Sequence, residues 1–403
     1  MGVEKNTDKI TNINARRTGR IEWMDGLKGI ACFQVFFNHF MCSIYPAYYM
    51  SGEQPVHTNG FEKWLAYSPL NLLLEGEMFV AIFCIISGFL LASKVMKMKK
   101  EFSRLSDVIV GRYFRLMLPV APIGVLVWLM TRLGWFTNVA ASNITGSEWL
   151  GSFYSRPMGI AEMLASVLIK TWFYGDDLLS TAFWMLSQLF IGSLIVVLLG
   201  CVYWKMPKKS IAIYLFVALA LIPRHDYVVA FVFGAIFAWL VIEDYINIFR
   251  KIDSSGKLST LIGVIAFALG IFVAGYPIQL EPRGIYVYLN CGFNDMWRIA
   301  GAVLVMYGVW NVELFQHILS GKILNRLGAI CYEFYIIHIP LLFSVGTGLF
   351  MIINNISGSY NVAGIISFFI IFGIVIAAAK LYSMYVSKWC AAVERKILGY
   401  FSS

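Results

Sequence analysis

Residues 362–379 read Val-Ala-Gly-Ile-Ile-Ser-Phe-Phe-Ile-Ile-Phe-Gly-Ile-Val-Ile-Ala-Ala-Ala, a stretch without a charged side chain. A helix that crosses the hydrocarbon core of a bilayer needs about 20 consecutive apolar residues. The rest of the chain has the same character: of its 403 residues, 59% are hydrophobic and only 14% are charged, and the mean hydropathy is +0.72. An ordinary soluble domain is roughly 45–50% apolar and about 25% charged. The composition therefore predicts a membrane protein and excludes a disordered or collagen-like chain.

Ten windows along the chain are apolar enough to be read as spanning helices. They lie at residues 27–46, 71–93, 116–135, 182–203, 210–223, 227–243, 259–276, 296–313, 328–353 and 362–386. The fifth and sixth are short, and since only Pro223-Arg224-His225-Asp226 separates them, they also fit one broken hairpin. We predict an all-α polytopic membrane protein with about ten transmembrane helices, made of an N-terminal tail (1–26), a transmembrane domain (27–388) and a C-terminal tail (389–403).

Basic residues predict the orientation, because cytoplasmic loops collect Lys and Arg. With the N-terminus inside, six basic residues lie before and at the start of the first window, and seven lie between the second and third windows. Both termini are therefore predicted to be cytoplasmic, and we expect the plasma membrane as the location. These loops, facing an anionic leaflet, account for the net charge of +9. Nucleic-acid binding is not predicted, since it would place such charges on one folded face with interleaved aromatic residues.

The seven cysteines are far apart and contain no C-x-x-C pair, so neither a metal site nor a disulfide framework is predicted. Cys42 and Cys291 would both lie outside and could pair in an oxidising compartment, but we interpret both as packing residues. A cleavable signal peptide is not expected, because the polar residues 1–26 precede the first window and no small-residue cleavage site follows it.

His39 lies inside the first window, eleven residues after Lys28. At about 1.5 Å per residue this separation is roughly 16 Å, half of a ~30 Å hydrocarbon core. A polar group at that depth is costly in lipid and points to a site, and an imidazole can take and return a proton near neutral pH. The alternative is a histidine that donates to a backbone carbonyl and serves packing alone.

The first apolar window and its approach contain Arg20-Ile-Glu-Trp-Met-Asp25-Gly-Leu-Lys28-Gly-Ile and then Asn38-His39. This segment resembles the acyltransferase-3 family of integral membrane acyltransferases. The first helix of that family carries a basic residue, ten residues and then His. Other segments are similar to the family in the same order, and they are Phe83-Cys-Ile-Ile-Ser87-Gly88-Phe89-Leu90, Arg112-Tyr-Phe-Arg115-Leu-Met-Leu-Pro119, residues 183–193, 226–234 and 327–340, and Val393-Glu394-Arg395. One departure is Leu189, which stands five residues after Trp184, where many relatives carry Glu.

The resemblance implies transfer of an acyl group, usually acetyl from cytoplasmic acetyl-CoA, to a hydroxyl of a carbohydrate or lipid-linked glycan. It places Asp25, Lys28 and His39 in the catalytic group. A sugar hydroxyl is a poor nucleophile until a base removes its proton, and His39 is the best-placed base in the sequence. No metal is implied.

The donor is polyanionic and arrives from the cytoplasm, so Lys28, Arg112 and Arg115 suit its phosphates. Ser87 is assigned to the same donor site by the resemblance. The alternative for the two arginines is the positive-inside rule, which requires basic residues there in any membrane protein. The alternative for Ser87-Gly88 is close packing of helices, which we favour.

Trp184, Tyr332 and His338 are weaker candidates for substrate contacts, since buried aromatic residues commonly serve packing. No fused domain is expected after the last window, so the membrane domain would act alone or with a separate glycan-assembly or transfer protein. A second interpretation is a non-enzymatic exporter of a glycan or small polar solute, because intramembrane His and Arg residues are compatible with transport. Transporters of that class often show inverted repeats, which the two halves of this sequence do not.

Overall fold

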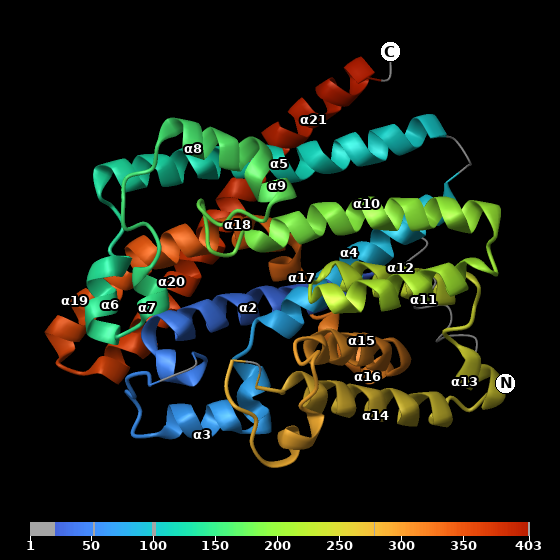
Figure 1. The fold of residues 1–403 in the computed structure, drawn as a ribbon, viewed down its shortest axis with the longest axis horizontal. Coiled ribbons are helices and arrows are strands. Elements are labelled where there is room, and N and C mark those ends of the chain that lie inside the picture. The colour runs from blue at the N-terminus through green and yellow to red at the C-terminus, as the bar shows by residue number, and fades with distance from the viewer. Residues whose placement is uncertain (1–20, 51–52, 99–101, 278, 402–403) are drawn as a thin grey trace.

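The computed structural model describes residues 21–50, 53–98, 102–277 and 279–401. These residues form helices and connecting turns and contain no β-strand. Several of the long helices run in roughly the same direction across Figure 1. The prediction of an all-α polytopic membrane protein is confirmed.

Within the described residues, seven continuous helical segments are long and apolar enough to cross a membrane. Each coincides with one of the ten windows. They are α2 (Glu22–Ile44), α4 (Glu77–Lys97), α5 (Phe102–Leu133), α10 (Trp184–Lys205), α14 (Lys257–Ala274), α18 (Cys331–Leu341) with the π-helical η6 (Leu342–Gly346) and α19 (Thr347–Ser357), and α20 (Tyr360–Tyr382) with η7 (Ser383–Ser387) and α21 (Lys388–Phe401).

The remaining three windows form shorter helices. The fifth and sixth become α11 (Ser210–Leu221), followed by η4 (Ile222–Arg224), and α12 (Val228–Ile242). The eighth becomes α15 (Met296–Asn311), which meets α16 (Glu313–Leu319) at a bend of 100°. Counted as one broken span, this pair raises the number of candidate membrane spans among the described residues to eight.

Short helices fill the connections between these segments. They are η1 (Pro46–Tyr48), α3 (Phe61–Tyr67), η2 (Pro69–Leu73), α6 (Asn138–Thr145), α7 (Glu148–Gly151), α8 (Ile160–Ala165), η3 (Ser166–Lys170), α9 (Thr171–Phe173), α13 (Ile248–Ile252), η5 (Gly284–Leu289) and α17 (Lys322–Ala329).

Contacts between distant loops define two ends of the helix bundle. At one end, which we call the outer end, His57 Nε2 lies 3.0 Å from the Thr145 carbonyl oxygen and His225 Nδ1 lies 2.7 Å from Asp295 Oδ1. At the other, the inner end, the Tyr203 hydroxyl donates to Glu243 at 2.8 Å. The charge pattern predicted the same grouping, because each contact joins two segments that were assigned to one side of the membrane. The short helices α11 and α12 therefore both run from one end to the other.

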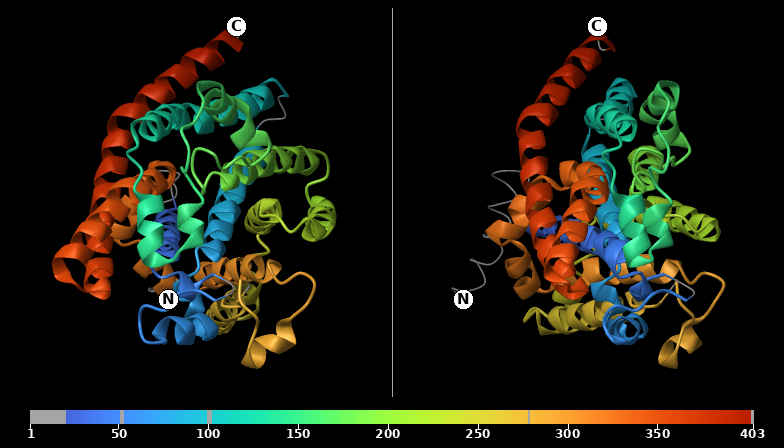
Figure 2. Two further views of the ribbon diagram at one scale, coloured as in Figure 1. Left: turned by 60° about the vertical axis from the view of Figure 1, so that its left-hand side comes forward. Right: turned by 90° about the vertical axis from the view of Figure 1, so that its left-hand side faces the viewer.

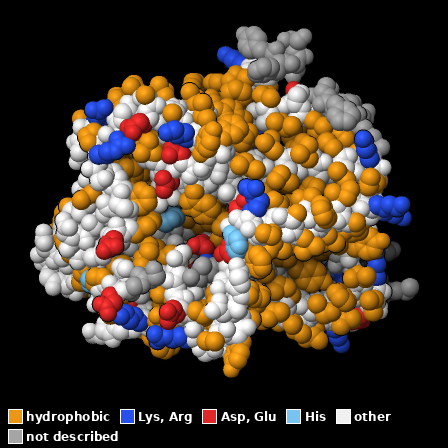
Figure 3. Space-filling model, viewed as in Figure 1, with side chains coloured by type: hydrophobic (Ala, Val, Ile, Leu, Met, Phe, Trp, Pro, Cys, Tyr) orange, Lys and Arg blue, Asp and Glu red, His pale blue; other side chains and the backbone are white. Residues whose placement is uncertain are grey.

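The surface has the banding expected of such an arrangement. In Figure 3 the right-hand edge carries Lys and Arg side chains, hydrophobic side chains cover much of the middle, and charged and polar groups gather towards the left. Apolar side chains are exposed on α11 and α20, among them Phe216 at 71% and Phe369 at 68%. Lipid is the natural partner of these faces.

Two boundaries differ from the sequence prediction. The third window was expected to begin at residue 116, but α5 begins at Phe102 and carries Arg112 and Arg115 within the helix. The second window was expected from residue 71, but η2 and the turn at Gly76 precede α4, which begins at Glu77. At the C-terminus α20 continues into α21, which projects beyond the other helices in both views of Figure 2.

The cysteines are all unpaired. Cys42 is buried, as expected of a packing residue, but Cys291 is exposed. The assignment of Cys291 to packing was therefore wrong, because residue 291 lies in a surface turn before α15 and not against a helix.

Candidate active site between α2 and α18

Two histidines from distant parts of the chain meet inside the bundle. His39 on α2 and His338 on α18 approach with 3.1 Å between His39 Nδ1 and His338 Nε2. His338 is fully buried, whereas His39 is partly exposed. The sequence identified both residues separately, and the fold brings them together.

The hydrogen bonds of the pair fix which ring nitrogens carry protons. His338 Nδ1 lies 2.7 Å from the Tyr335 carbonyl oxygen, which can only accept, so this nitrogen carries hydrogen. In a neutral His338 the Nε2 atom is then an acceptor, and His39 must donate to it from Nδ1. His39 Nε2 is left with a lone pair. In this arrangement His338 sets the tautomer of His39 and leaves the His39 Nε2 atom as a hydrogen-bond acceptor.

Trp149 covers His39 from the outer end. The indole on α7 and the imidazole are nearly parallel, with ring centroids 5.8 Å apart and an interplanar angle of 6°. The α7 segment is held there by Ser147, whose hydroxyl donates to the Cys42 carbonyl oxygen at 2.8 Å. Trp149 was not predicted from the sequence, because an aromatic residue in a long loop carries no signal of what it covers.

A buried ionic cluster lies beside this part of α2. Arg298 on α15, with 0% of its side chain exposed, donates from Nε to Glu75 at 2.5 Å and from Nη1 to Glu77 at 2.7 Å. The hydroxyls of Tyr49 and Tyr227 also donate to Glu77, at 2.6 and 3.0 Å. The cluster pairs two carboxylates with one guanidinium and ties α15 to the beginning of α4.

This cluster was also not predicted from the sequence. Glu75 and Glu77 lie at the edge of the second window and Arg298 near the start of the eighth. The rule that charged residues in apolar windows mark sites could have found Arg298.

The chain segment that carries these glutamates also touches α2. The Asn38 side-chain amide donates to the Leu74 carbonyl oxygen at 2.8 Å, and Gln34 donates to Leu73. Since Asn38 precedes His39, the turn before α4 helps to fix the position of the histidine helix.

Asp25 and Lys28 lie at the beginning of α2 and form an ion pair, with 2.6 Å between Lys28 Nζ and Asp25 Oδ1. Eleven residues, or roughly 16 Å of helix, separate Lys28 from His39. The structure therefore does not join these three predicted catalytic residues into one cluster. The α17 helix packs closely here: a Cβ on Gly328 would lie 1.9 Å from the Asp25 carbonyl oxygen.

A small cavity of about 10 Å³, enough for about one water molecule, lies between the depth of Lys28 and the depth of His39 along α2. Cys32 and Val35 line it from α2, Phe83 from α4, and Tyr335 and His338 from α18. Positions 28, 32, 35 and 39 share one helix face, because they are separated by four, three and four residues. The cavity therefore lies on the line that joins Lys28 to the histidine pair.

The two predicted donor arginines have different partners. Arg112 Nε donates to the Ser193 hydroxyl on α10 at 3.0 Å, which leaves its two terminal nitrogens for other contacts. Arg115 Nη2 lies 2.8 Å from Glu394 Oε1 on α21, and its Nε also donates to that carboxylate. Arg115 and Glu394 were each identified in separate family segments, and the structure shows them as an ion pair.

Ser87 and its neighbour Gly88 lie where α4 packs against α12. A Cβ on Gly88 would lie 2.4 Å from the Phe231 carbonyl oxygen, so this contact admits only glycine. The close packing favoured for this segment is confirmed for Gly88. Leu189, which replaces the glutamate of many relatives, is buried on α10.

Two weaker candidates also have packing partners. The Tyr332 hydroxyl donates to the Leu116 carbonyl oxygen at 2.6 Å, and the Trp184 ring packs 5.4 Å from that of Tyr227. Of the three predicted substrate residues, only His338 contacts the candidate base.

A family model described as an acyltransferase domain, that of the acyltransferase-3 family, matches residues 21–383. This chain belongs to the acyltransferase-3 family. The match covers every helix of the candidate site except α21, and the resemblance noted from the sequence is confirmed.

Curated relatives of this acyltransferase-3 protein match over shorter stretches. Acyltransferase R4 of Phoma sp. is 26% identical over 136 residues, which are 31% of this chain and 29% of the relative. O-acetyltransferase PaAT-1 of Phomopsis amygdali is 29% identical over 28% of this chain and 23% of the relative. The chain thus covers less than a third of the length of these two relatives. No solved structure matches.

Proposed function

We propose that this protein is a membrane-bound acyltransferase that moves an acetyl group from acetyl-CoA to a hydroxyl, with His39 as the general base. The observation that carries the proposal is the His39–His338 pair, with its 3.1 Å contact inside a helix bundle of the acyltransferase-3 family. A partly exposed imidazole that is oriented through one nitrogen and open at the other has the geometry of a general base.

The reaction on this base needs no other proton carrier. His39 Nε2 takes the proton of the acceptor hydroxyl as the oxygen attacks the thioester carbonyl carbon of acetyl-CoA. The carbon–sulfur bond then breaks, and the leaving CoA thiolate takes the proton back from His39. In the intermediate state the His39 imidazolium continues to donate from Nδ1 to His338.

The donor would enter from the inner end. Lys28 and Arg112 lie at that end of α2 and α5 and carry charges that suit the phosphates of CoA. The small cavity beside Cys32 and Val35 lies between Lys28 and His338, and the side chains that line it would have to move apart to admit the donor. Lys28 and His39 are roughly 16 Å apart along the helix. The chain of acetyl-CoA that joins its phosphates to its thioester would have to extend over this distance.

The acceptor would approach His39 from the outer end, past Trp149. The aromatic face of Trp149 suits the apolar face of a sugar ring, which supports a carbohydrate or lipid-linked glycan as acceptor. We place the reaction in the plasma membrane, with a separate glycan-assembly or transfer protein as a partner.

The direct test is acetyl transfer by the purified protein in liposomes. We expect label from [¹⁴C]acetyl-CoA to appear on a carbohydrate hydroxyl, and His39→Gln protein in the same liposomes to give the background value. Movement of unmodified solute across the bilayer without labelled product would instead support an exporter.

Arg112 should matter more for donor binding than Arg115. Arg112→Ala is expected to raise the Kd for acetyl-CoA about ten- to hundredfold, because a charge-assisted contact is worth about 1.5–3 kcal/mol. Arg115→Ala should change it only about threefold or less, since that guanidinium already pairs with Glu394. Isothermal titration in detergent measures both, with Lys208→Ala, an exposed basic residue beyond α10, as control. Unchanged affinity in Arg112→Ala would leave Arg112 as a topology determinant.

His338 should act as a positioning residue. His338→Leu removes the acceptor for His39 Nδ1–H and is expected to lower kcat about 10²-fold, as small misplacements of a catalytic group do. His338→Gln offers a carbonyl oxygen in its place and should recover part of the loss. The KM for acetyl-CoA should not change in either variant. Equal kcat values for the Leu and Gln variants would contradict this role.

A further inference from the structure

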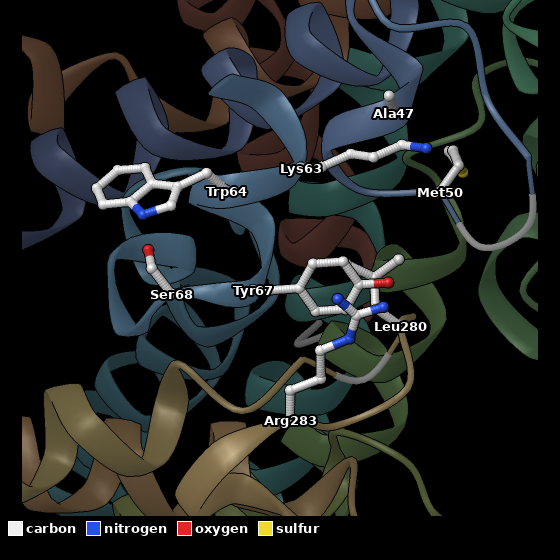
Figure 4. Close-up of a pocket in the computed structure, with 8 residues that line it drawn as sticks. All are labelled: Ala47, Met50, Lys63, Trp64, Tyr67, Ser68, Leu280 and Arg283. Carbon is white, nitrogen blue, oxygen red and sulfur yellow. The ribbon is translucent and has the colours of Figure 1, made fainter. Parts of the chain in front are cut away.

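A pocket at the outer end is separate from the histidine pair. It has a volume of about 440 Å³ and is lined by η1, the segment that follows η1, α3 and the loop before η5. Figure 4 shows Lys63 and Arg283 reaching into it from opposite sides, with the Trp64 indole at one edge. None of the residues that line it belongs to the predicted catalytic, donor or substrate sets.

Two basic side chains, Lys63 and Arg283, line the pocket. Arg283 lies across the Tyr67 ring, with its guanidinium carbon 3.9 Å from the ring centroid. Lys63, on α3, is exposed. Within the part of the chain that the structure describes, neither residue forms an ion pair. Two unpaired cations in one concave site favour an anionic ligand, and the guanidinium fork suits an oxyanion such as phosphate.

The short helices that line or adjoin the pocket, α3, η2 and η5, have the character of a membrane interface. Trp64 is 58% exposed, Leu73 on η2 is 57% exposed, and Tyr288 on η5 is 88% exposed. Further exposed apolar side chains on these helices are Phe61, Leu70, Ile285 and Val287. Trp and Tyr are enriched where a protein meets lipid headgroups, and large exposed apolar groups there avoid water by contacting acyl chains.

We propose that this pocket binds the phosphate of an amphiphile whose apolar chain lies in the outer leaflet. Lys63 and Arg283 hold the phosphate, and the exposed side chains of α3, η2 and η5 contact the chain. An anionic phospholipid and a lipid-linked acceptor present the same chemistry, a phosphate at the headgroup level on a long apolar tail. The proposal does not require acetyl transfer, because it concerns a site outside the histidine pair.

Native mass spectrometry of the full-length protein in neutral detergent tests this binding. We expect phosphatidylglycerol to bind about tenfold or more tightly than phosphatidylcholine, and Lys63→Gln/Arg283→Gln to abolish that preference. Lys170→Gln, which changes an exposed lysine of η3 outside the pocket, is the matched control and should bind as the parent does. A thermal-unfolding midpoint equal to that of the parent would show that the double variant is folded.

Two further binding measurements, with a polyprenyl phosphate and with inorganic phosphate, identify the kind of molecule that supplies the phosphate. Tighter binding of a polyprenyl phosphate than of phosphatidylglycerol would indicate a lipid-linked acceptor, and the reverse would indicate a membrane phospholipid. Parental phosphatidylglycerol affinity in the double variant would overturn the proposal. Complete displacement of phosphatidylglycerol by equimolar inorganic phosphate would also overturn it, because the apolar chain would then contribute nothing.

Discussion

His39→Gln should reduce acetyl transfer about 10²–10⁴-fold while acetyl-CoA binding and membrane insertion survive. Glutamine keeps a hydrogen-bonding group of similar volume, so the contact with His338 can persist, but its amide cannot take a proton from the acceptor. Two quantities are measured on the same protein preparation: the initial rate of acetyl transfer from radiolabelled acetyl-CoA, and the Kd for acetyl-CoA.

The matched control is His317→Gln, which makes the same change at an exposed histidine of α16. It should transfer acetyl at the parental rate. If His39→Gln also transferred at that rate, His39 would be a packing residue and the base would have to be sought at His338. If His39→Gln lost donor binding together with turnover, the substitution would have disturbed the inner part of α2 and the proton-transfer role would be unsupported.

The helical segments of the fold could be predicted from hydropathy, but their ends could not. Each of the ten windows lies over a helix, because the lack of water in lipid forces an apolar stretch to satisfy its backbone internally. The extension of α5 back to Phe102 was missed, since a helix that leaves the bilayer can be rich in polar and basic residues. Its helical state depends on packing, and the contact between Arg115 and Glu394 on α21 is part of that packing.

The candidate site was only partly predictable. His39 could be identified because an ionisable residue in the middle of an apolar window is rare, and its spacing from Lys28 matched a family pattern. Its contact with His338 joins residues 299 positions apart, and no local pattern encodes that distance. The cluster of Arg298, Glu75 and Glu77 was missed for two reasons. Each residue lies near the edge of an apolar window, where a charged residue is expected to mark the end of a helix. The three come together only through the packing of α15 against α4, which no local pattern encodes.

That cluster should make Arg298 one of the residues most important for stability. Arg298→Met is expected to lower the free energy of unfolding by about 3–5 kcal/mol, because it leaves the buried Glu75 carboxylate without its partner. Protonation or replacement of that carboxylate should relieve the loss, so Glu75→Gln in the same chain should restore part of the stability. Thermal unfolding in detergent, followed with a thiol-reactive dye that reports exposure of the buried Cys42 and Cys84, measures both.

The control for this prediction is a surface pair of the same chemistry. Arg250 Nη2 lies 3.4 Å from Glu313 Oε1, and both side chains are exposed. Arg250→Met should therefore cost about 1 kcal/mol or less, since water screens and solvates both charges. The difference between the two methionine variants isolates the effect of burial. Equal, small losses of unfolding free energy in the two variants would mean that water reaches Glu75. The cluster would then be a solvated polar contact, and it would contribute little to holding the turn at Leu74 against Asn38 on α2.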